Sequence, residues 1–446
     1  MRSSLSYLRY VRFFVPKSEQ PGFSHFVNNM YTKLNIPRNS RAILLNPRYE
    51  EIVKIRSSYG NVVRKTPLVY SETFSKMSGS KVYMKAEFAQ KTGSFKLRGP
   101  YAKIHSMSAS EKKHGVIAAS AGNHAQGVAY ASKLEKIPCT IVMPITASPA
   151  KVAATRGYGA KVILEGINYD ESWAKAQQIS KKTGAKIIHA FDDPQIIAAN
   201  GAIGLEILED LPDVDEIYVP IGGGGLAAGI LLAVKTKKPN IKVIGVESKA
   251  FPAMKNSIKA KRLQAVKGQR TIADGIAVKM PGKNTFRIIN ELIDDIVTVD
   301  DTQIVKTMFL LMERAKMVVE PAGVVALAYL LNSKPAPNKK VVPVLGGGNV
   351  DMYLLGQIVS KGLATMSRLV KMFILLKDKP GALKEVVDEI ASLSVNIVEV
   401  THDRLSSEID AGTAGVTLSL EMEGKEHAQK LVAHLKSKNI QFKILT

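Results

Sequence analysis

The regular alternation of short apolar strands with helices is the feature that most limits what this chain can fold into. From residue 46 to about residue 350, segments such as KVYMKAEF, GVIAAS, CTIVMP and EIYVPI are each closed by glycine, proline or polar residues, and helical patterns separate them. This order predicts an α/β fold, with a parallel sheet covered by helices on both faces. Because ligand sites in such sheets lie beyond the carboxyl ends of the strands, we expect functional residues in the loops that follow them.

The C-terminal part of the chain follows a different order. A helical stretch at 351–370 leads to strand, helix, two strands, helix and strand, which is the βαββαβ order of ferredoxin-like units. About 76 residues are enough for a small core of their own. We therefore expect four segments: a basic, disordered extension at 1–45, a main domain of two subdomains at 46–350, a helical connector at 351–370 and a separate small domain at 371–446.

The composition is that of a globular protein, with 46% hydrophobic and 23% charged residues and no apolar run long enough to span a membrane. The single cysteine, Cys139, excludes internal disulfides and cysteine-based zinc sites and favours a reducing compartment, so we expect a cytoplasmic protein. The formal charge of +23 attracts phosphate-bearing partners in general. Since no nucleic-acid-binding motif accompanies it, we expect no specific nucleic-acid partner.

The first thirty residues are rich in arginine and serine and contain one acidic residue, Glu19, which is the composition of an organelle transit peptide. Two other interpretations remain open. The segment could be a disordered tail, or translation could begin at Met30 after an upstream start codon.

The loop KTGSFKLRG places Lys96 just inside a predicted helix, with Ser94 as a candidate N-cap. A lysine at such a position is most often a solvated side chain. Next to Phe95 and a helix N-terminus, however, desolvation and the helix dipole would keep its amine partly deprotonated. An imine-forming lysine requires this state.

Three further loops follow predicted strands. Residues 120–127 (SAGNHAQG) begin a predicted helix, where backbone amides are free, and they add the polar side chains of Ser120, Asn123 and His124. These groups could bind a carboxylate or a ring hydroxyl. The same pattern also fits an ordinary helix cap. Residues 221–229 (IGGGGLAAG) bring four glycines to a helix N-terminus, which suits a single phosphate, because neither a P-loop nor GxGxxG is present. The loop LGGGNVD would approach the same crevice.

Taken together and in this order, SFKLRG, SAGNHAQG, GGGGL, EPAG and GGNVD resemble the tryptophan-synthase-β-like family of pyridoxal-phosphate enzymes, and within it the threonine ammonia-lyases (threonine dehydratases). The resemblance covers about residues 48–446. It implies fold type II, with two open twisted parallel-rich sheets flanked by helices, and pyridoxal 5'-phosphate as cofactor. The C-terminal unit, with DKPGAL at its first turn, resembles an ACT domain. That implies regulation by an amino-acid effector and a homo-oligomer, which in this family is a tetramer.

The resemblance implies a role for each motif residue. Lys96 would form the Schiff base with the cofactor and later act as the base. Asn123 would bond the cofactor's 3-hydroxyl, and Glu320 would lie near its ring. The other expected site residues divide by ligand: for the cofactor, Phe95, Gly346 and the phosphate loop Gly222, Gly223, Gly224, Gly225 and Leu226; for the substrate carboxylate, Ser120, Gly122 and His124.

Departures from relatives refine this expectation. Ala121 stands where serine racemases have a second serine, so a proton donor for the opposite face of the substrate is missing and elimination is favoured over racemisation. Gly346 stands where family members commonly have Ser or Cys, whose side chain contacts the pyridine nitrogen of the cofactor. In this chain a water or a neighbouring side chain would be the partner of that nitrogen. Because no carboxylate is evident there, we expect a neutral pyridine. Glu247 matches one cation ligand of racemase-like relatives, but Phe251 and Ala253 stand where others would be, so we assign no metal.

The expected activity removes water and ammonia from L-threonine to give 2-oxobutanoate, and from L-serine to give pyruvate. Lys96 would take the α-proton, and the cofactor phosphate would protonate the leaving hydroxyl, because no carboxylic acid is evident for that step. Serine racemase, hydroxyaspartate dehydratase and a non-catalytic amino-acid sensor remain alternatives, and Lys96 argues against the sensor. The sequence leaves open whether isoleucine or valine feedback marks a biosynthetic enzyme or whether the role is catabolic.

Overall fold

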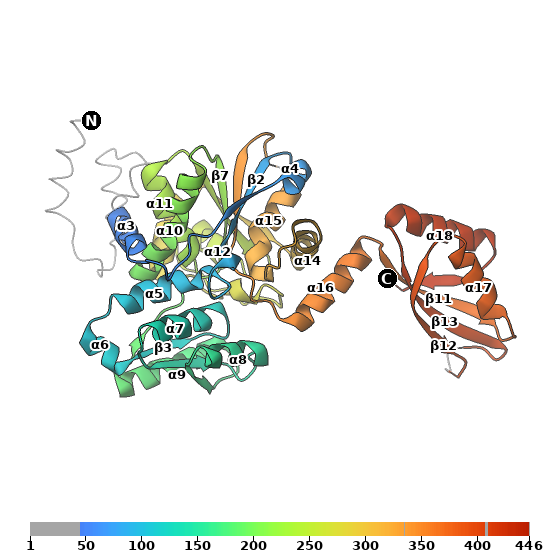
Figure 1. The fold of residues 1–446 in the computed structure, drawn as a ribbon, viewed down its shortest axis with the longest axis horizontal. Helices are drawn as coiled ribbons and strands as arrows, with labels where there is room; N and C mark the ends of the chain where they lie inside the picture. The colour runs from blue at the N-terminus through green and yellow to red at the C-terminus, as the bar shows by residue number, and fades with distance from the viewer. Residues whose placement is uncertain (1–44, 334, 406–408, 446) are drawn as a thin grey trace.

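The computed structural model describes residues 45–333, 335–405 and 409–445. Two parallel-rich sheets with their helices form the larger part of the molecule, and a third sheet stands apart beyond a single helix (Figure 1). The predicted α/β class and the C-terminal ferredoxin-like order are confirmed. Apart from Leu45, the predicted extension and its transit-peptide alternative lie outside the described residues.

The larger sheet has six strands in the order β1-β2-β10-β7-β8-β9. All neighbours are parallel except β1 and β2, which pair antiparallel at one edge. The interior strands are almost continuous apolar runs, because helices cover both of their faces. The bounds are β1 (Leu68–Ser71), β2 (Lys81–Ala86), β7 (Glu216–Pro220), β8 (Lys242–Ser248), β9 (Asp295–Val299) and β10 (Lys340–Leu345).

The smaller sheet has four parallel strands in the order β5-β4-β3-β6. The apolar segment KIIHAF at 186–191 has the pattern of a longer strand, but pairing stops after two residues. The chain turns at His189, whose Nδ1 accepts the amides of Phe191 and Asp192. Strands β1 and β9 of the larger sheet were not predicted. The bounds are β3 (Val116–Ala119), β4 (Cys139–Met143), β5 (Lys161–Leu164) and β6 (Lys186–Ile187).

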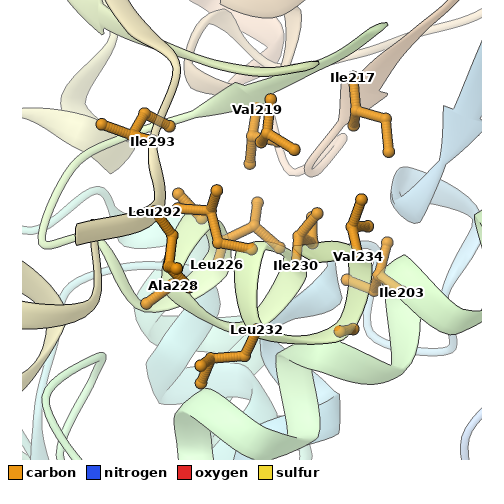
Figure 2. Packing of buried hydrophobic residues seen from close by; sticks show 14 of the residues in the cluster. Ile203, Ile217, Val219, Leu226, Ala228, Ile230, Leu232, Val234, Leu292 and Ile293 are labelled. Carbon is orange, nitrogen blue, oxygen red and sulfur yellow. The ribbon is translucent and has the colours of Figure 1, made fainter. Parts of the chain in front are cut away.

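Helix α11 (Gly225–Lys237) forms the centre of the largest core cluster. It is apolar on nearly every side, which is the pattern of a helix buried all round. Figure 2 shows its Ile230 and Val234 below Ile217 and Val219 of β7. The glycine loop therefore leads into a helix that is buried from Gly225 to Lys235.

The other helices of the larger part cover the two sheets and join them. Helix α10 packs along α11, α5 and α3 at the boundary between the two sheets. The bounds are α3 (Tyr49–Ser57), α4 (Glu72–Ser78), α5 (Arg98–His105), α6 (Ala109–His114), α7 (Asn123–Leu134), α8 (Pro149–Gly157), α9 (Tyr169–Thr183), α10 (Pro194–Asp210), α12 (Ala253–Ala260), α13 (Lys283–Leu292), α14 (Asp301–Leu310), a π-helical turn (Leu311–Ala315) and α15 (Pro321–Ser333).

The C-terminal unit has a four-stranded antiparallel sheet in the order β12-β13-β11-β14, and its own core. Burial alternates along β11, so one face of the sheet is covered by the two helices. The connector α16 belongs to the larger part: a Cβ on Gly362 would lie 2.2 Å from the ring of Phe309 in α14. The bounds are α16 (Met352–Thr365), β11 (Leu369–Lys377), α17 (Ala382–Ala391), β12 (Asn396–Asp403), β13 (Thr413–Glu421), α18 (Lys425–Ser437) and β14 (Phe442–Ile444).

A buried network of four charged side chains ties the lysine loop to the core. Arg98 donates to both carboxylate oxygens of Glu87, at 2.7 and 2.8 Å, and to both of Glu206, at 2.7 and 2.9 Å. Lys85 donates to Glu206 at 2.6 Å and to the carbonyl of Thr66 at 2.7 Å. The exposed fractions of these four charged side chains are between 0 and 2%. Every charge in this dry interior is therefore paired and hydrogen-bonded.

Replacing Arg98 tests how far this network supports the fold. We expect Arg98→Leu to lower the free energy of unfolding by about 3–5 kcal/mol, because it leaves two buried carboxylates with one lysine between them. Urea titration followed by circular dichroism measures the change. The exposed Arg156→Leu removes the same charge and should change stability by less than about 0.5 kcal/mol. Equal stability of the two variants would contradict the argument.

Candidate active site

Lys96 lies in a single 3-10 turn, Phe95–Leu97, just before helix α5. Its Nζ donates to the backbone carbonyl of Ala190 at 2.8 Å and lies 5.1 Å from the centre of the Phe95 ring. Burial lowers the pKa of the amine to about 8, and the nearby charge of Glu320 opposes this shift. Burial therefore favours the free amine of Lys96, and its role as the imine-forming lysine stays a prediction.

Ser94 does not cap the helix, so that prediction was wrong. Its side chain makes no capping hydrogen bond, and its Oγ is buried without a partner among the described residues. Instead, the backbone of Ser94 forms a β-bridge with Gly347, and the amide of Phe95 donates to the carbonyl of Gly346 at 3.1 Å. Backbone pairing with the LGGGNVD loop therefore positions the lysine turn.

Helix α7 packs against the backbone of Lys96 at Gly127. A Cβ on Gly127 would lie 2.4 Å from the carbonyl oxygen of Lys96 and 2.9 Å from its carbonyl carbon. Such contacts require the backbone to move. The glycine that ends the SAGNHAQG motif therefore sets the distance between this motif and the lysine.

Asn123 and Glu320, both predicted site residues, contact each other directly. Asn123 Nδ2 donates to Glu320 Oε1 at 2.6 Å, and Asn349 Nδ2 donates to Asn123 Oδ1 at 2.8 Å and to the carbonyl of Thr92 at 2.8 Å. Burial, reinforced by the charge of Asp274, raises the pKa of Glu320 to about 7. Sequence analysis did not single out Asn349, although it lies within the GGNVD motif.

The glycine loop turns from β7 into α11. Gly224 has a φ of +95°, in the left-handed region that favours glycine. Thr285 Oγ1 donates to the carbonyl of Gly223 at 2.7 Å and so holds the loop from α13. The first amides of a helix have no intrahelical partner, so the start of α11 at Gly225 and Leu226 presents N–H groups to an anion. Gly222, at the start of the loop, lies against Ile276.

The segment Ala190–Phe191 joins the lysine to the glycine loop. The carbonyl of Ala190 accepts the hydrogen bond from Lys96, and Phe191 packs so closely on the loop that a Cβ on Gly223 would lie 2.3 Å from its ring. The next residue, Asp192, accepts hydrogen bonds from three amides at the start of α13. Sequence analysis missed this segment because its contacts are made by a backbone carbonyl and an apolar ring.

The predicted carboxylate-binding residues Ser120, Gly122 and His124 lie in the turn between β3 and α7 and in the first turn of α7. Ser120 Oγ accepts the amide of Gly122 at 3.2 Å, so this pair shapes the turn. His124 is buried, its Nε2 lies 2.9 Å from the carbonyl of Ile188, and burial lowers the pKa of the imidazole to about 3. A neutral ring that donates from Nε2 offers a lone pair at Nδ1, so its backbone amide, and not its ring, is the group suited to a carboxylate. The substrate role of these three residues stays a prediction.

Gly346 offers space but no polar group. A Cβ built there would lie 3.6 Å from the Phe95 ring, which is ordinary van der Waals contact. Steric crowding therefore does not explain why this chain has glycine where relatives have Ser or Cys. The Oγ of the neighbouring Ser94 is a polar atom beside Gly346, and it has no hydrogen-bond partner among the described residues.

Glu247 has a structural role in this chain. Its carboxylate accepts the amides of Met254 and Lys255, at 2.8 and 2.9 Å, at the start of α12, and burial raises its pKa to about 7. Among the described residues, no group of three or more His, Cys, Asp or Glu side chains is placed to hold a metal.

Within the described part of the chain, no helix combines the length and the apolar surface needed to cross a bilayer.

Several buried polar atoms around Lys96 have no partner in the described structure, namely Thr92 Oγ1, Ser94 Oγ and His124 Nδ1. Unpaired buried polar atoms are rare in proteins, and a polar ligand or ordered water would satisfy them. A desolvated lysine, a fixed asparagine and a helix N-terminus suit an aldehyde, a ring hydroxyl and a phosphate respectively. The residues present therefore fit pyridoxal phosphate.

Comparison with protein families identifies the family of this chain. A family model described as pyridoxal-phosphate dependent enzyme matches residues 60–347. This chain belongs to the pyridoxal-phosphate-dependent enzyme family. The matched range contains the Lys96 turn, the start of α7, the glycine loop and Glu320.

Individual pyridoxal-phosphate enzymes are similar over most of the chain. An L-threonine ammonia-lyase of Thermotoga maritima is 44% identical over 396 residues, which are 89% of this chain and 99% of that protein. The solved structure of the processed form of threonine deaminase isoform 2 from Solanum lycopersicum is 35% identical, with a TM-score of 0.67, over 71% of this chain and 90% of that chain. Maize serine racemase is 34% identical, with a TM-score of 0.67, over 71% of this chain and 98% of that chain.

The contact between Gly127 and Lys96 can be tested by adding one methyl group. We expect Gly127→Ala to weaken pyridoxal phosphate binding and to lower activity by at least about tenfold, because the Lys96 backbone must move away from α7. Equilibrium titration of the apoprotein with the cofactor measures the binding. Gly157→Ala, whose Cβ would meet nothing within 4 Å, is the control and should bind normally.

The lowered pKa of Lys96 predicts a pH dependence. Reaction with an aldehyde requires the free amine, and a pKa of about 8 in place of 10.5 means that half of the amine is free near pH 8. The rate of cofactor uptake by the apoprotein should therefore rise as the pH increases and level off above about pH 8. Stopped-flow absorbance between pH 6.5 and 10 measures it. A rate that keeps rising to pH 10 would contradict the shift.

Proposed function

We propose that the protein deaminates L-threonine to 2-oxobutanoate and ammonia, and L-serine to pyruvate and ammonia. The observation that carries the proposal is the Lys96 amine, which is desolvated, hydrogen-bonded to the Ala190 carbonyl and set beside the Asn123–Glu320 pair. Similarity to proteins named L-threonine ammonia-lyase and threonine deaminase supports it.

Pyridoxal phosphate, when bound, supplies an electron-withdrawing ring that accepts the electron pair left at the substrate α-carbon. The protein contributes the base. Lys96 Nζ, as the free amine, removes the α-proton, and its pKa of about 8 makes a useful fraction of free amine present at neutral pH. The Ala190 carbonyl holds this amine in place through its hydrogen bond.

The start of two helices binds the anionic groups in this scheme. Amides at the start of α11 hold the phosphate, and amides at the start of α7 hold the substrate carboxylate. Asn123 is fixed on both sides, by Glu320 and Asn349, so its amide is preorganised for the ring hydroxyl. Because the pKa of Glu320 is about 7, part of this carboxyl is protonated at neutral pH, which limits negative charge beside the ring.

Serine racemisation is the second candidate, because maize serine racemase has the same fold at 34% identity. Racemisation needs a second proton donor on the face opposite Lys96. The residue expected there is Ala121, which carries no hydroxyl, so elimination remains the favoured activity. Hydroxyaspartate remains a possible alternative substrate of the same site.

The arrangement of the chain supports four further proposals. We infer the domain limits 46–350, 351–370 and 371–446 from the separate C-terminal core and from α16 between the two domains.

An amino-acid effector at the ACT-like unit regulates the enzyme. The protein forms a homo-oligomer, since the edge strand β12 exposes Val398 and Val400 at 60% and 47%. Its location is the cytoplasm, which accords with a single buried cysteine.

Loss of the Lys96 amine tests the proposed reaction. Lys96→Ala should lower the release of 2-oxobutanoate from L-threonine by at least about a thousandfold, and it should abolish the absorbance of covalently bound cofactor. The exposed Lys133→Ala on α7 is the matched control and should behave as the unmodified protein.

Product analysis separates the candidates with the unmodified protein. Chiral chromatography after incubation with L-serine should show pyruvate and no D-serine. D-serine as the main product would replace the lyase with a racemase. Cofactor binding without turnover of threonine, serine or hydroxyaspartate would favour the sensor, and full activity of Lys96→Ala would overturn the mechanism.

A further inference from the structure

A strongly basic segment runs from α12 to the start of α13. Residues 255–283, called the basic segment from here on, contain eight lysines and arginines and one acid, Asp274. The side chains of all eight cations are exposed: Lys255, Lys259, Lys261, Arg262, Lys267, Arg270, Lys279 and Lys283. The chain as a whole has a formal charge of +23, and the proposed reaction does not require this excess. The basic segment is therefore a feature that the proposed function leaves unexplained.

Most of these cations lack an acidic partner. Among the described residues, Lys279 is the one member of the group that forms an ion pair, with Asp170 at 3.5 Å. The nearby acids are engaged in other contacts. Asp274 pairs with Lys151 of α8 at 2.7 Å, and Asp301 accepts hydrogen bonds from a hydroxyl and an amide of the basic segment at 2.6 and 3.0 Å. The charges of the other seven cations therefore act on the surrounding solvent.

The backbone of the basic segment is held in place, although most of it forms neither helix nor strand. The amide of Val266 donates to the carbonyl of Lys279 at 2.9 Å, so the two arms of the segment lie side by side. The amide of Gln264 donates to Ser257 Oγ at 2.9 Å and so fixes the first arm to the end of α12. Both arms therefore contribute their cations to one field.

The basic segment lies against the glycine loop. A Cβ on Gly222 would lie 2.9 Å from the Cα of Ile276, which belongs to the segment. A Cβ on Gly224 would lie 2.8 Å from Met254, which directly precedes the segment. The glycine loop leads into the start of α11, whose amides suit a phosphate. The positive charge therefore borders the end of the site that suits the cofactor phosphate.

The helix N-terminus and the basic segment act over different distances. The attraction of a helix terminus for an anion falls off within about one turn, whereas exposed charges act over the Debye length, which is about 8 Å at physiological ionic strength. A phosphate monoester carries about −1.5 to −2 charges at pH 7. Charge of the opposite sign beside a binding site raises the association rate of such a ligand by about ten- to a thousandfold.

We propose that the basic segment captures pyridoxal phosphate from solution and directs its phosphate to the glycine loop. The exposed cations set the rate at which the cofactor arrives, and the amides at the start of α11 hold it afterwards. The inference concerns the cofactor of the family and does not rest on threonine deamination. Absence of threonine turnover would therefore overturn the proposed function without touching the capture.

The composition of the basic segment favours a small phosphate ester over a nucleic acid. Residues 255–283 contain no Phe, Tyr or Trp. Sequence-tolerant binding of single strands relies on aromatic side chains on which the bases stack. Cations without such side chains attract phosphate groups but offer nothing to the bases, so a compact anion that moves on to the adjoining glycine loop is the better match.

Stopped-flow mixing of the full-length apoprotein with pyridoxal phosphate tests the capture. The second-order association rate constant should fall by at least about tenfold between about 0.01 and 1 M NaCl, because the Debye length falls from about 30 to about 3 Å. Pyridoxal has the same aldehyde but no phosphate, so its rate constant should change by less than about twofold over this range. A rate for pyridoxal phosphate that does not depend on salt would overturn the proposal.

Neutral substitutions place the effect on the basic segment. At about 0.01 M NaCl, a variant with four substitutions should associate with the cofactor at least about fivefold more slowly and lose most of the salt dependence. Its dissociation rate and its turnover at saturating cofactor should stay unchanged, because contacts in the bound state are retained. The four substitutions are Lys259→Gln, Lys261→Gln, Lys267→Gln and Arg270→Gln.

Two control variants separate local charge from total charge and from packing. The first removes four exposed lysines from the last turns of α6, α7 and α9, at helix ends that lead into the strands and so lie opposite the crevice. It should associate within about twofold of the unmodified protein. Its substitutions are Lys113→Gln, Lys133→Gln, Lys181→Gln and Lys182→Gln. The second changes Lys259, Lys261 and Lys267 to arginine, which keeps the charge and should keep the rate.

The remaining outcomes are equally decisive. Equal association rates of the two neutral variants would overturn the proposal, and a loss of turnover at saturating cofactor would show that the four cations support the fold instead. Anisotropy titration with a labelled single-stranded oligonucleotide tests the other class of anion. If the variant of the basic segment lost oligonucleotide binding but kept its rate of cofactor association, the surface would serve a nucleic acid and the capture of the cofactor would be wrong.

Discussion

The buried pairing of Arg98 and Lys85 with Glu87 and Glu206 is the interaction on which the position of the active-site lysine depends. Arg98 follows Lys96 by two residues, and its guanidinium is held by Glu87 of the turn after β2 and by Glu206 of α10. Moving this part of the chain would separate charges that are fully buried, which is strongly destabilising. The lysine turn is therefore rigid at one end, and its reactive amine does not need to be ordered when ligand binds.

The motif glycines are required by packing between backbones as much as by a ligand. Gly127 meets the carbonyl of Lys96, Gly223 lies under the Phe191 ring, and a Cβ on Gly323 would lie 2.6 Å from the carbonyl of Gly347. These contacts bring the lysine turn, the glycine loop and the last motif close together beyond the carboxyl ends of the strands. The lowered pKa of the amine and the raised pKa of the carboxyl follow from this close assembly, because burial disfavours the charged form of each group.

The C-terminal unit is attached to the larger part through the connector α16 and one ion pair. The connector α16 is held on α14 by the close contact of Gly362 with Phe309, so it does not bend there. Ser367, between α16 and β11, has a φ of +55°, an uncommon conformation for a residue other than glycine. The ion pair of Arg368 with Glu313 then spans the junction directly after this residue.

The sequence by itself determined the alternating α/β order, the βαββαβ unit and the loops that carry Lys96, Asn123, Glu320 and the four glycines. These features depend on the identity and spacing of side chains, which the sequence states directly. Only the tertiary structure decided the rest. Ala190 binds the lysine through a backbone carbonyl, Ser94 pairs its backbone instead of capping, and strand β1 forms against β2 with only four residues. Any residue can supply a backbone group, so such contacts leave no pattern in the sequence and appear only when distant segments are packed together.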